Sequence, residues 1–346
     1  EMSRGLGDVY KRQTPDGKTL LDDGKIIYTG PVAEGTKFYK RHGYYYLSIP
    51  EGGVGEGWQT ILRSKNIYGP YEKKVVLEQG NTTVNGPHQG ALVDTPEGEW
   101  WFFHFQLTEP LGRVVHLQPV CWMENWPVIG VDMDMNGIGE PVKVWTKPGV
   151  SKSVLVSHPQ TTDDFNSYTL GLQWQFNHNP VNTHWSLNER RGWLALKALK
   201  AATLRESRNM LTQKCMGYLS TATVLLDFSA LADGQRGGLF CTGSLYNGIG
   251  ISREEGKNYL YLEKNGDVQQ VKMVSGKKIY LRVMLDAKKN RCQLFYSFDN
   301  CNFILCGDAY SLKFGDWKGA RVGLYSYNTL GIGGKCYFDW FNYDFN

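Results

Sequence analysis

Short runs of β-prone residues follow one another along the first 150 residues, and tight turns separate them. Trp100-Trp101-Phe102-Phe103-His104-Phe105 is a near-continuous apolar run, and Tyr44-Tyr45-Tyr46-Leu47 is a second run rich in aromatic residues. Gly, Pro and Asp occupy the turns, as in Asp94-Thr95-Pro96-Glu97-Gly98. Strands of this length and spacing are typical of the four-stranded blades of a β-propeller. The pattern predicts that residues 14–150 form part of such a propeller.

A second all-β region is predicted for residues 163–346, after a linker at 151–162 that is rich in Ser, Thr and Pro. Its clearest strand is Tyr259-Leu260-Tyr261-Leu262-Glu263, which a Lys-Asn-Gly-Asp turn follows, and Val322-Gly323-Leu324-Tyr325 lies near the end. Many short strands joined by Asn-Gly and Asp-Gly turns indicate a sandwich of two sheets. The sequence therefore predicts an all-β chain with a partial propeller followed by a β-sandwich.

The N-terminal segment differs from the rest. Residues 1–13 show no alternation and no continuity with the strand pattern after them, so we interpret them as a sequence scar and expect them to lie outside the fold. Residues 14–30 predict a hairpin that leads into the first blade.

Composition narrows the function classes. The 346 residues suffice for about two domains, and 13% of them are aromatic, which suits all-β cores and also sugar binding. The net charge of +4 is spread without long runs, so neither nucleic acid nor a membrane surface is an expected partner. Seven Cys without a regular spacing predict free and mostly buried thiols. Nothing in the sequence assigns a compartment or an oligomeric state.

Two lone titratable residues stand at the heads of successive predicted blades. Glu34 precedes Gly35, and His88 lies in Gly86-Pro87-His88-Gln89-Gly90. This placement suggests a carboxyl group and an imidazole that face one central pocket. The alternative is a solvated turn glutamate and a core histidine, and spacing alone favours that alternative. His104 and His116 lie within predicted strands, and we interpret both as structural.

Two other motifs carry no chemistry in this interpretation. Asp132-Met133-Asp134-Met135-Asn136-Gly137 matches the start of a calcium loop, but its twelfth position is Lys143 rather than Glu, and no helical periodicity flanks it. We interpret it as an Asx-rich turn. We also interpret the glycosylation sequon Asn81-Thr82-Thr83 as incidental.

The stretch from Pro31 to Trp101 resembles glycoside hydrolase family 43, the β-xylosidases and α-L-arabinofuranosidases built on a five-bladed propeller. The likeness rests on an acid followed by glycine, a Lys-x-x-Gly-Tyr-Tyr-Tyr hairpin, an Arg-Ser-x-x-Ile-x-Gly-Pro-Tyr-Glu element and a Gly-x-His-x-x-x-Leu-Val-Asp segment. The second half is similar to the concanavalin-like, jelly-roll domain that follows the propeller in many β-xylosidases. That likeness rests on Gln-Trp-Gln-x-Asn-His-Asn-Pro from Gln173, on Arg208 to Gln213 and on Phe338-Asp339-Trp340-Phe341.

The resemblance implies roles for four residues. Glu34 matches the general acid, His88 matches a histidine of the central channel that holds water or a metal ion, and Arg113 matches an arginine that holds sugar hydroxyls. Trp58 is a further candidate for binding substrate. No cofactor is required, although family members sometimes hold Ca²⁺ in the channel.

The implied function is exo-acting, inverting hydrolysis of oligosaccharides derived from xylan or arabinoxylan. The family's general base and the Asp that tunes the acid have no convincing counterpart in this sequence. Asp8 lies in the segment that we interpret as a scar, and Asp16, Asp22 and Asp23 sit in turns. We therefore expect an N-terminally truncated enzyme with little or no activity.

Two rival hypotheses concern the second half. It is either a non-catalytic carbohydrate-binding sandwich that presents aromatic residues such as Trp174 or Trp185, or a structural brace for the propeller. A fold by itself does not decide between them.

Overall fold

The computed structural model describes residues 8–149, 157–315, 318–331 and 333–346. These residues divide into two compact units. Unit 1 comprises residues 8–108 and 113–149, and unit 2 comprises residues 109–112 together with the described residues from 157 to 346. Both units consist of β-strands, apart from one short 3₁₀ turn, η1 (Asn182–His184), so the predicted all-β class is confirmed.

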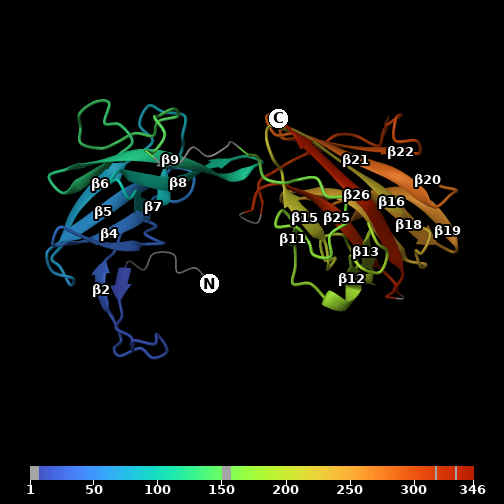
Figure 1. Ribbon diagram of the computed structural model, residues 1–346, viewed down its shortest axis with the longest axis horizontal. Coiled ribbons are helices and arrows are strands. Elements are labelled where there is room, and N and C mark those ends of the chain that lie inside the picture. The colour runs from blue at the N-terminus through green and yellow to red at the C-terminus, as the bar shows by residue number, and fades with distance from the viewer. Residues whose placement is uncertain (1–7, 150–156, 316–317, 332) are drawn as a thin grey trace. The chain divides into compact units, whose positions relative to one another are not determined.

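Unit 1 contains two four-stranded antiparallel sheets and one two-stranded hairpin (Figure 1). The ten strands are β1 (Asp8–Tyr10), β2 (Lys25–Tyr28), β3 (Lys37–Arg41), β4 (Tyr44–Glu51), β5 (Trp58–Ser64), β6 (Glu72–Leu77), β7 (His88–Asp94), β8 (Trp100–Thr108), β9 (Gly112–Met123) and β10 (Trp126–Ile129). The orders β3-β4-β5-β6 and β10-β9-β8-β7 are those of two successive propeller blades, each an up-and-down meander.

The two blades share one hydrophobic core. Tyr46 and Ile61 from the first blade pack with Phe102 and Ile129 from the second, and all four side chains are fully buried. The phenol of Tyr46 also donates a hydrogen bond to the backbone carbonyl of Asn125, over 2.9 Å, in the β9–β10 turn. Burial of large aromatic and β-branched side chains on the facing sides of the sheets holds the blades together.

The N-terminal segment takes part in this unit from residue 8 onward. β1 pairs with β2, and the Arg12 guanidinium donates to the Asp22 carboxylate over 2.7 Å. We expected residues 1–13 to lie outside the fold, whereas residues 8–13 join the hairpin that we predicted only from residue 14. Residues 1–7 lie outside the described residues.

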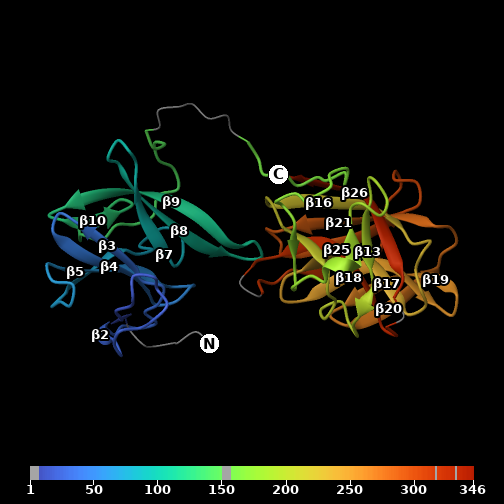
Figure 2. The ribbon, with the colours of Figure 1, turned by 60° about the horizontal axis from the view of Figure 1, so that its bottom comes forward.

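Unit 2 is a sandwich of two large sheets (Figures 1 and 2). One sheet has the order β11-β15-β25-β17-β18-β19-β20, with β14 also paired to β25; the other has the order β12-β13-β26-β16-β21-β22-β23, with β24 also paired to β22. The strands are β11 (Gln175–Phe176), β12 (Trp185–Ser186), β13 (Leu194–Lys197), β14 (Leu199–Lys200), β15 (Leu211–Lys214), β16 (Leu219–Asp227), β17 (Gln235–Thr242), β18 (Tyr246–Glu254), β19 (Lys257–Lys264), β20 (Asp267–Met273), β21 (Lys278–Asp286), β22 (Arg291–Ser297), β23 (Ile304–Leu305), β24 (Tyr310–Ser311), β25 (Arg321–Asn328) and β26 (Lys335–Phe345).

Side chains that alternate along these strands fill the space between the two sheets. Leu226, Leu239, Leu281 and Phe338 are fully buried members of this core. All seven cysteines are free, and five of them are buried. Among the described residues, no helix has the length and apolar character needed to cross a membrane.

The start of unit 2 lies earlier than the predicted boundary at residue 163. Thr161, within the predicted linker, donates a hydrogen bond to the Tyr343 carbonyl of β26 over 2.7 Å, and Gln213 donates to the Thr161 carbonyl, also over 2.7 Å. These contacts make Thr161 part of the sandwich. Most of the rest of the predicted linker, residues 151–156, lies outside the described residues.

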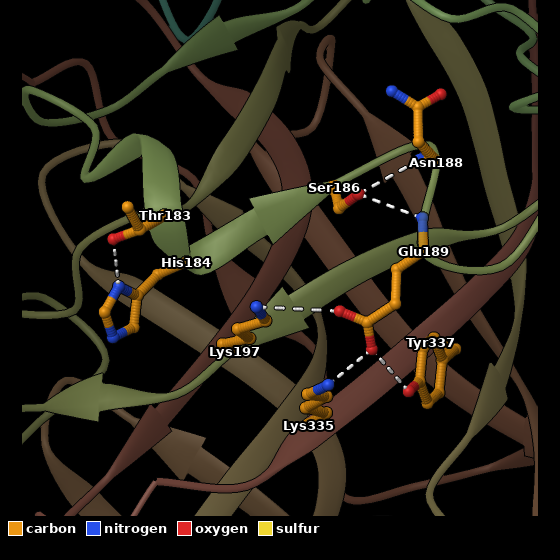
Figure 3. A network of polar contacts seen from close by, with 8 residues as sticks. All are labelled: Thr183, His184, Ser186, Asn188, Glu189, Lys197, Lys335 and Tyr337. Carbon is orange, nitrogen blue, oxygen red and sulfur yellow. Dashed lines mark hydrogen bonds and ion pairs between the residues drawn. The ribbon is translucent and has the colours of Figure 1, made fainter.

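A network of polar contacts ties the segment after β12 to β13 and β26 (Figure 3). The Glu189 carboxylate accepts hydrogen bonds from Lys335 over 2.5 Å and from the Tyr337 phenol over 2.9 Å, and it lies 3.6 Å from the Lys197 ammonium group. These contacts, with the Lys335 hydrogen bond the strongest, lower the pKa of Glu189. The network anchors a long connection on one sheet of the sandwich.

The core of unit 2 can be tested by truncating one side chain. Leu226→Ala should lower the free energy of unfolding by about 2–5 kcal/mol, because it removes buried methyl groups and leaves a cavity. Leu172→Ala is the matched control, since Leu172 is fully exposed. Chemical denaturation measures both variants, and equal stability of the two would contradict the described core.

Candidate active site

Four segments of unit 1 meet at one end of the two blades. They are the turn at residues 31–35, the β4–β5 connection with its flanking residues, the start of β7, and the facing parts of β8 and β9. All four predicted site residues, Glu34, Trp58, His88 and Arg113, belong to these segments.

Glu34 follows a turn whose backbone conformation is unusual. Val32 has φ of 52°, a left-handed conformation that is rare for a β-branched residue. The backbone N–H of Glu34 donates to the Pro50 carbonyl near the end of β4, over 3.2 Å. The backbone of Glu34 is therefore held beside the end of β4, and the residue is half-buried. Strain of this kind persists where the surrounding contacts compel it, and such places are often functional sites.

His88 begins β7 at an irregularity of the sheet. The register with β8 shifts between His88 and Ala91, and Gln89 between them has φ of 58°. A bulge of this kind changes the direction in which a strand presents its side chains. The Gln89 N–H donates to the Gln59 side chain over 3.1 Å, which holds the bulge in place.

The His88 imidazole is fully buried against backbone. Its Nδ1 lies 2.8 Å from the Gly86 carbonyl, and its Nε2 has no hydrogen-bond partner among the described residues. A Cβ atom on Gly57 would lie 2.8 Å from the imidazole and 2.5 Å from the Glu51 carbonyl oxygen, so only glycine fits there. Because a buried polar atom without a partner is costly, Nε2 is suited to a water molecule or a substrate hydroxyl.

The structure brings Glu34 and Arg113 close enough to act on the charge of His88. Burial lowers the pKa of His88 and Arg113 lowers it further, whereas the Gly86 carbonyl and the Glu34 carboxylate oppose this shift. The Arg113 guanidinium lies 4.6 Å from the ring centroid of Phe105, the cross-strand partner of His88. Phe105 thus lies against both the His88 imidazole and the Arg113 guanidinium. That Glu34 and His88 face one pocket stays a prediction.

Trp58 lies opposite a buried carboxylate, Glu51, that we did not predict from the sequence. Glu51 is fully buried at the end of β4, directly opposite Trp58 of β5. Its side chain accepts hydrogen bonds from the Trp58 indole over 3.3 Å, from the Tyr28 phenol over 2.7 Å and from Thr60, and the Lys73 ammonium lies 3.1 Å away.

These partners stabilise the ionised form of Glu51. Burial alone would raise the pKa of Glu51, but the hydrogen bonds from Thr60, Tyr28 and Lys73 outweigh burial and lower it. Glu51 is therefore a fixed anion that orients Trp58. The sequence held a signal for it, because Glu51 precedes Gly52 just as Glu34 precedes Gly35.

His104 and His116 form a stacked pair with ring centroids 5.3 Å apart. The Val142 N–H donates a hydrogen bond to the Gln118 side-chain oxygen at 2.7 Å, and this bond fixes the orientation of the amide group. The Gln118 amide nitrogen therefore faces His104 Nε2 at 3.2 Å and donates a hydrogen bond to it. His104 Nδ1 then donates to the Phe105 carbonyl over 3.1 Å. His104 is thereby held as a neutral imidazole with both nitrogens bonded, as expected for a structural histidine.

Calcium in the channel stays a prediction for this chain. Ca²⁺ prefers six to eight oxygen ligands. No cluster of three or more His, Cys, Asp and Glu suited to a metal occurs among the described residues, and two buried atoms at the start of β7, His88 Nε2 and Gln89 Oε1, have no hydrogen-bond partner there. In the Asx-rich turn, Asp132 and Asp134 instead accept backbone N–H groups of Asn136 and Gly137.

The rival hypothesis that Trp174 is an exposed aromatic residue for glycan binding is wrong. Trp174 is buried in the core of unit 2, where its indole donates to the Asp163 carboxylate over 2.7 Å and packs against Phe341. Trp185 is half-buried, packs on Phe176, and donates to Asn182 over 3.3 Å. Both tryptophans thus have structural contacts that the spacing of the sequence does not reveal.

Propeller blades that gather a carboxyl group, an imidazole and a guanidinium at one end, followed by a concanavalin-like sandwich, define the class of the glycoside hydrolases with this architecture. The model of glycosyl hydrolases family 43 matches residues 7–127, and that of the β-xylosidase C-terminal concanavalin A-like domain matches residues 162–344. The chain belongs to glycoside hydrolase family 43.

Individual relatives agree. The chain is 53% identical over 315 residues to a putative β-xylosidase of Xylanibacter ruminicola, and the aligned region covers 91% of this chain and 59% of that protein. It is 31% identical over 263 residues to a non-reducing end α-L-arabinofuranosidase of Bacteroides ovatus, and this aligned region covers 71% of this chain and 46% of that protein. The crystal structure of a family 43 protein from Bacillus licheniformis superposes with a TM-score of 0.85 at 26% identity, covering 97% and 70%. The chain thus spans about three fifths of the length of the Xylanibacter relative.

The buried histidine pair makes the stability of unit 1 depend on pH. Burial lowers the pKa of His104 to about 4, whereas an unfolded chain has a histidine pKa of about 6.5. The unfolded state therefore binds more protons between these values, so the stabilisation is fully present above pH ~6.5 and is lost as the pH falls through ~4. The shift corresponds to about 3 kcal/mol.

We therefore expect His104→Gln to reduce the acid-induced fall in the unfolding temperature between pH 7 and pH 4.5, measured by calorimetry. Above pH 7 the two proteins should show parallel pH profiles, which serves as the internal control. An unchanged acid slope in the variant would contradict the buried, neutral state of His104.

Proposed function

We propose that this protein hydrolyses glycosides at the non-reducing end of oligosaccharides derived from xylan or arabinoxylan, releasing xylose or arabinose, with Glu34 as the general acid. The observation that carries the proposal is the position of the Glu34 backbone at the end of β4, where the neighbouring Gly35 lies against the side chain of Gln89, the residue after His88. The names of the relatives, a putative β-xylosidase and an α-L-arabinofuranosidase, support the substrate class.

The reaction needs two carboxyl groups on opposite sides of the sugar. The acid protonates the departing glycosidic oxygen while a carboxylate base activates water at the anomeric carbon, and inverting enzymes hold the two groups about 6.5–9.5 Å apart. In the proposed arrangement Glu34 supplies the proton. Arg113 and Trp58 hold the sugar through hydroxyl groups and an aromatic face, and His88 Nε2 binds a water molecule or a hydroxyl.

Glu51 is a poor candidate for the base. Four side chains bind its carboxylate, and the lowered pKa makes it a weak proton acceptor. Asp16 and Asp22 are also engaged, since Asp16 accepts from Thr14 and from the Lys18 N–H, and Asp22 pairs with Arg12. We therefore retain the expectation that this chain turns over slowly.

Replacing Glu34 tests the assignment of the acid. Glu34→Gln should lower kcat/KM on 4-nitrophenyl β-D-xylopyranoside by about 10²–10⁴-fold, because the leaving group then departs unprotonated. The loss should be smaller on the 2,4-dinitrophenyl xyloside, whose leaving group needs less protonation. Glu97→Gln is the control, since Glu97 is exposed in the turn at the far end of β7.

A second arm addresses slow turnover. Azide can attack the anomeric carbon in place of activated water, so added azide should accelerate release of the dinitrophenolate and yield a xylosyl azide of inverted configuration. Parallel assays with 4-nitrophenyl α-L-arabinofuranoside compare the two sugars. If Glu34→Gln keeps the rate of the unchanged protein on every substrate, Glu34 is not the acid.

A further inference from the structure

A polar pocket lies on one sheet of unit 2, away from its core. It occupies about 520 Å³ and is lined by residues of β17, β18, β19 and β20, four strands that are successive in the chain and adjacent in the sheet, and by residues of the loops beside them. Its volume falls within the range of about 300–1,000 Å³ that is usual for small-molecule sites.

Cross-strand register explains why this pocket forms. Arg236 of β17 stands opposite Ser252 of β18, which stands opposite Tyr259 of β19. Residues directly opposite each other in antiparallel strands share a face of the sheet, so these three side chains form one row. The small Ser252 between two long side chains leaves a gap with a hydroxyl group at its floor.

The Ser252 hydroxyl is the atom that points to a ligand. Ser252 is only 1% exposed, and its Oγ has no hydrogen-bond partner among the described residues. Buried hydroxyl groups are nearly always hydrogen-bonded, and an unsatisfied one is costly. A ligand hydroxyl in the pocket would satisfy it.

The charged groups around Ser252 are held in place by one another. The Glu254 carboxylate accepts a hydrogen bond from the Gln270 amide over 2.7 Å and lies 4.0 Å from the Arg236 guanidinium. Arg236 also donates to the Tyr327 phenol over 3.3 Å. Planar groups fixed in this way suit paired hydrogen bonds to neighbouring hydroxyls, because little side-chain entropy remains to be lost on binding.

The balance of charge argues against an anionic ligand. Among the described lining residues, Asp233, Glu254 and Glu255 are acidic, and Arg236 is the cation. The half-buried ring of Tyr259 adds an apolar surface. A neutral molecule with several hydroxyl groups and an apolar face fits this combination of donors, acceptors and aromatic carbon.

We propose that this pocket is a sugar-binding site that holds a neutral pyranose or furanose unit of an oligosaccharide, separate from the hydrolytic site of unit 1. In this site Ser252 and Arg236 donate to sugar hydroxyls, Glu254 accepts from one, and Tyr259 contacts the apolar face of the ring.

Calorimetric titration of the full chain with xylotetraose tests the site, and the Glu34→Gln background prevents hydrolysis during the titration. Ser252→Ala should weaken binding by about 3- to 10-fold, the worth of one hydrogen bond. It should leave the unfolding temperature unchanged or higher, because the Ser252 hydroxyl makes no hydrogen bond with any other described residue. Tyr259→Ala should weaken binding at least as much.

Two control variants accompany these. Ser297→Ala removes a buried hydroxyl of β22, in the other sheet, that donates a hydrogen bond to Asp299 over 2.8 Å, so it should lower the unfolding temperature without changing affinity. Tyr218→Ala removes a tyrosine that is 51% exposed and lies outside the pocket, and it should change neither quantity.

The outcomes separate the alternatives. Cellotetraose binding that the same two variants weaken also supports a neutral sugar site. The proposal is overturned if Ser252→Ala and Tyr259→Ala both bind xylotetraose with unchanged affinity. It is also overturned if sodium phosphate displaces the sugar and the same two variants bind phosphate more weakly, because the site would then be an anion site. Sugar binding at the site of unit 1 contributes equally to all these titrations, because every protein compared carries the same Glu34→Gln substitution. The nitrophenyl glycoside assays test the site of unit 1 independently.

Discussion

The close approach of the His88 imidazole to the backbone of Gly57 is the constraint on which the candidate active site depends. Only a residue without a Cβ atom fits between the imidazole and the Glu51 carbonyl. This contact joins the start of β7 in one blade to the β4–β5 connection in the other. The backbone of Glu34 is bonded to Pro50 at the end of β4, directly before that connection, so residues 50–57 contact both the segment of the acid and the imidazole.

Polar groups in both units are placed by the register of antiparallel strands. In unit 1, register puts Trp58 opposite Glu51, and a bulge at Gln89 reorients His88. In unit 2, register aligns Arg236, Ser252 and Tyr259 in a row. A shift by one residue would turn each of these side chains to the other face of its sheet. The large apolar cores therefore stabilise the strand register that both sites need, because a strand shifted by one residue would also expose its core side chains to water.

The prediction succeeded where the signal was local and failed where it depended on long-range contacts. The all-β class, the hairpins and the structural state of His104 followed from strand patterns and turn residues. The burial of Trp174 did not, because its partners Asp163 and Phe341 are 11 and 167 residues away along the chain. Glu51 precedes a glycine just as Glu34 does, but its burial and its partners Tyr28 and Lys73 on other strands are not visible in the sequence. Residues 8–13 looked foreign, yet β1 pairs with β2.

The amino-acid sequence by itself determined the family, the order of the two β units and the identity of the candidate acid, because alternation and short motifs are properties of neighbouring residues. Only the tertiary structure decided which segments lie beside that acid, which carboxylate is held as an ion by four partners, and which buried hydroxyl has no hydrogen-bond partner among the described residues. Those properties arise from strands that meet through folding, and their pairing is not written in any one segment.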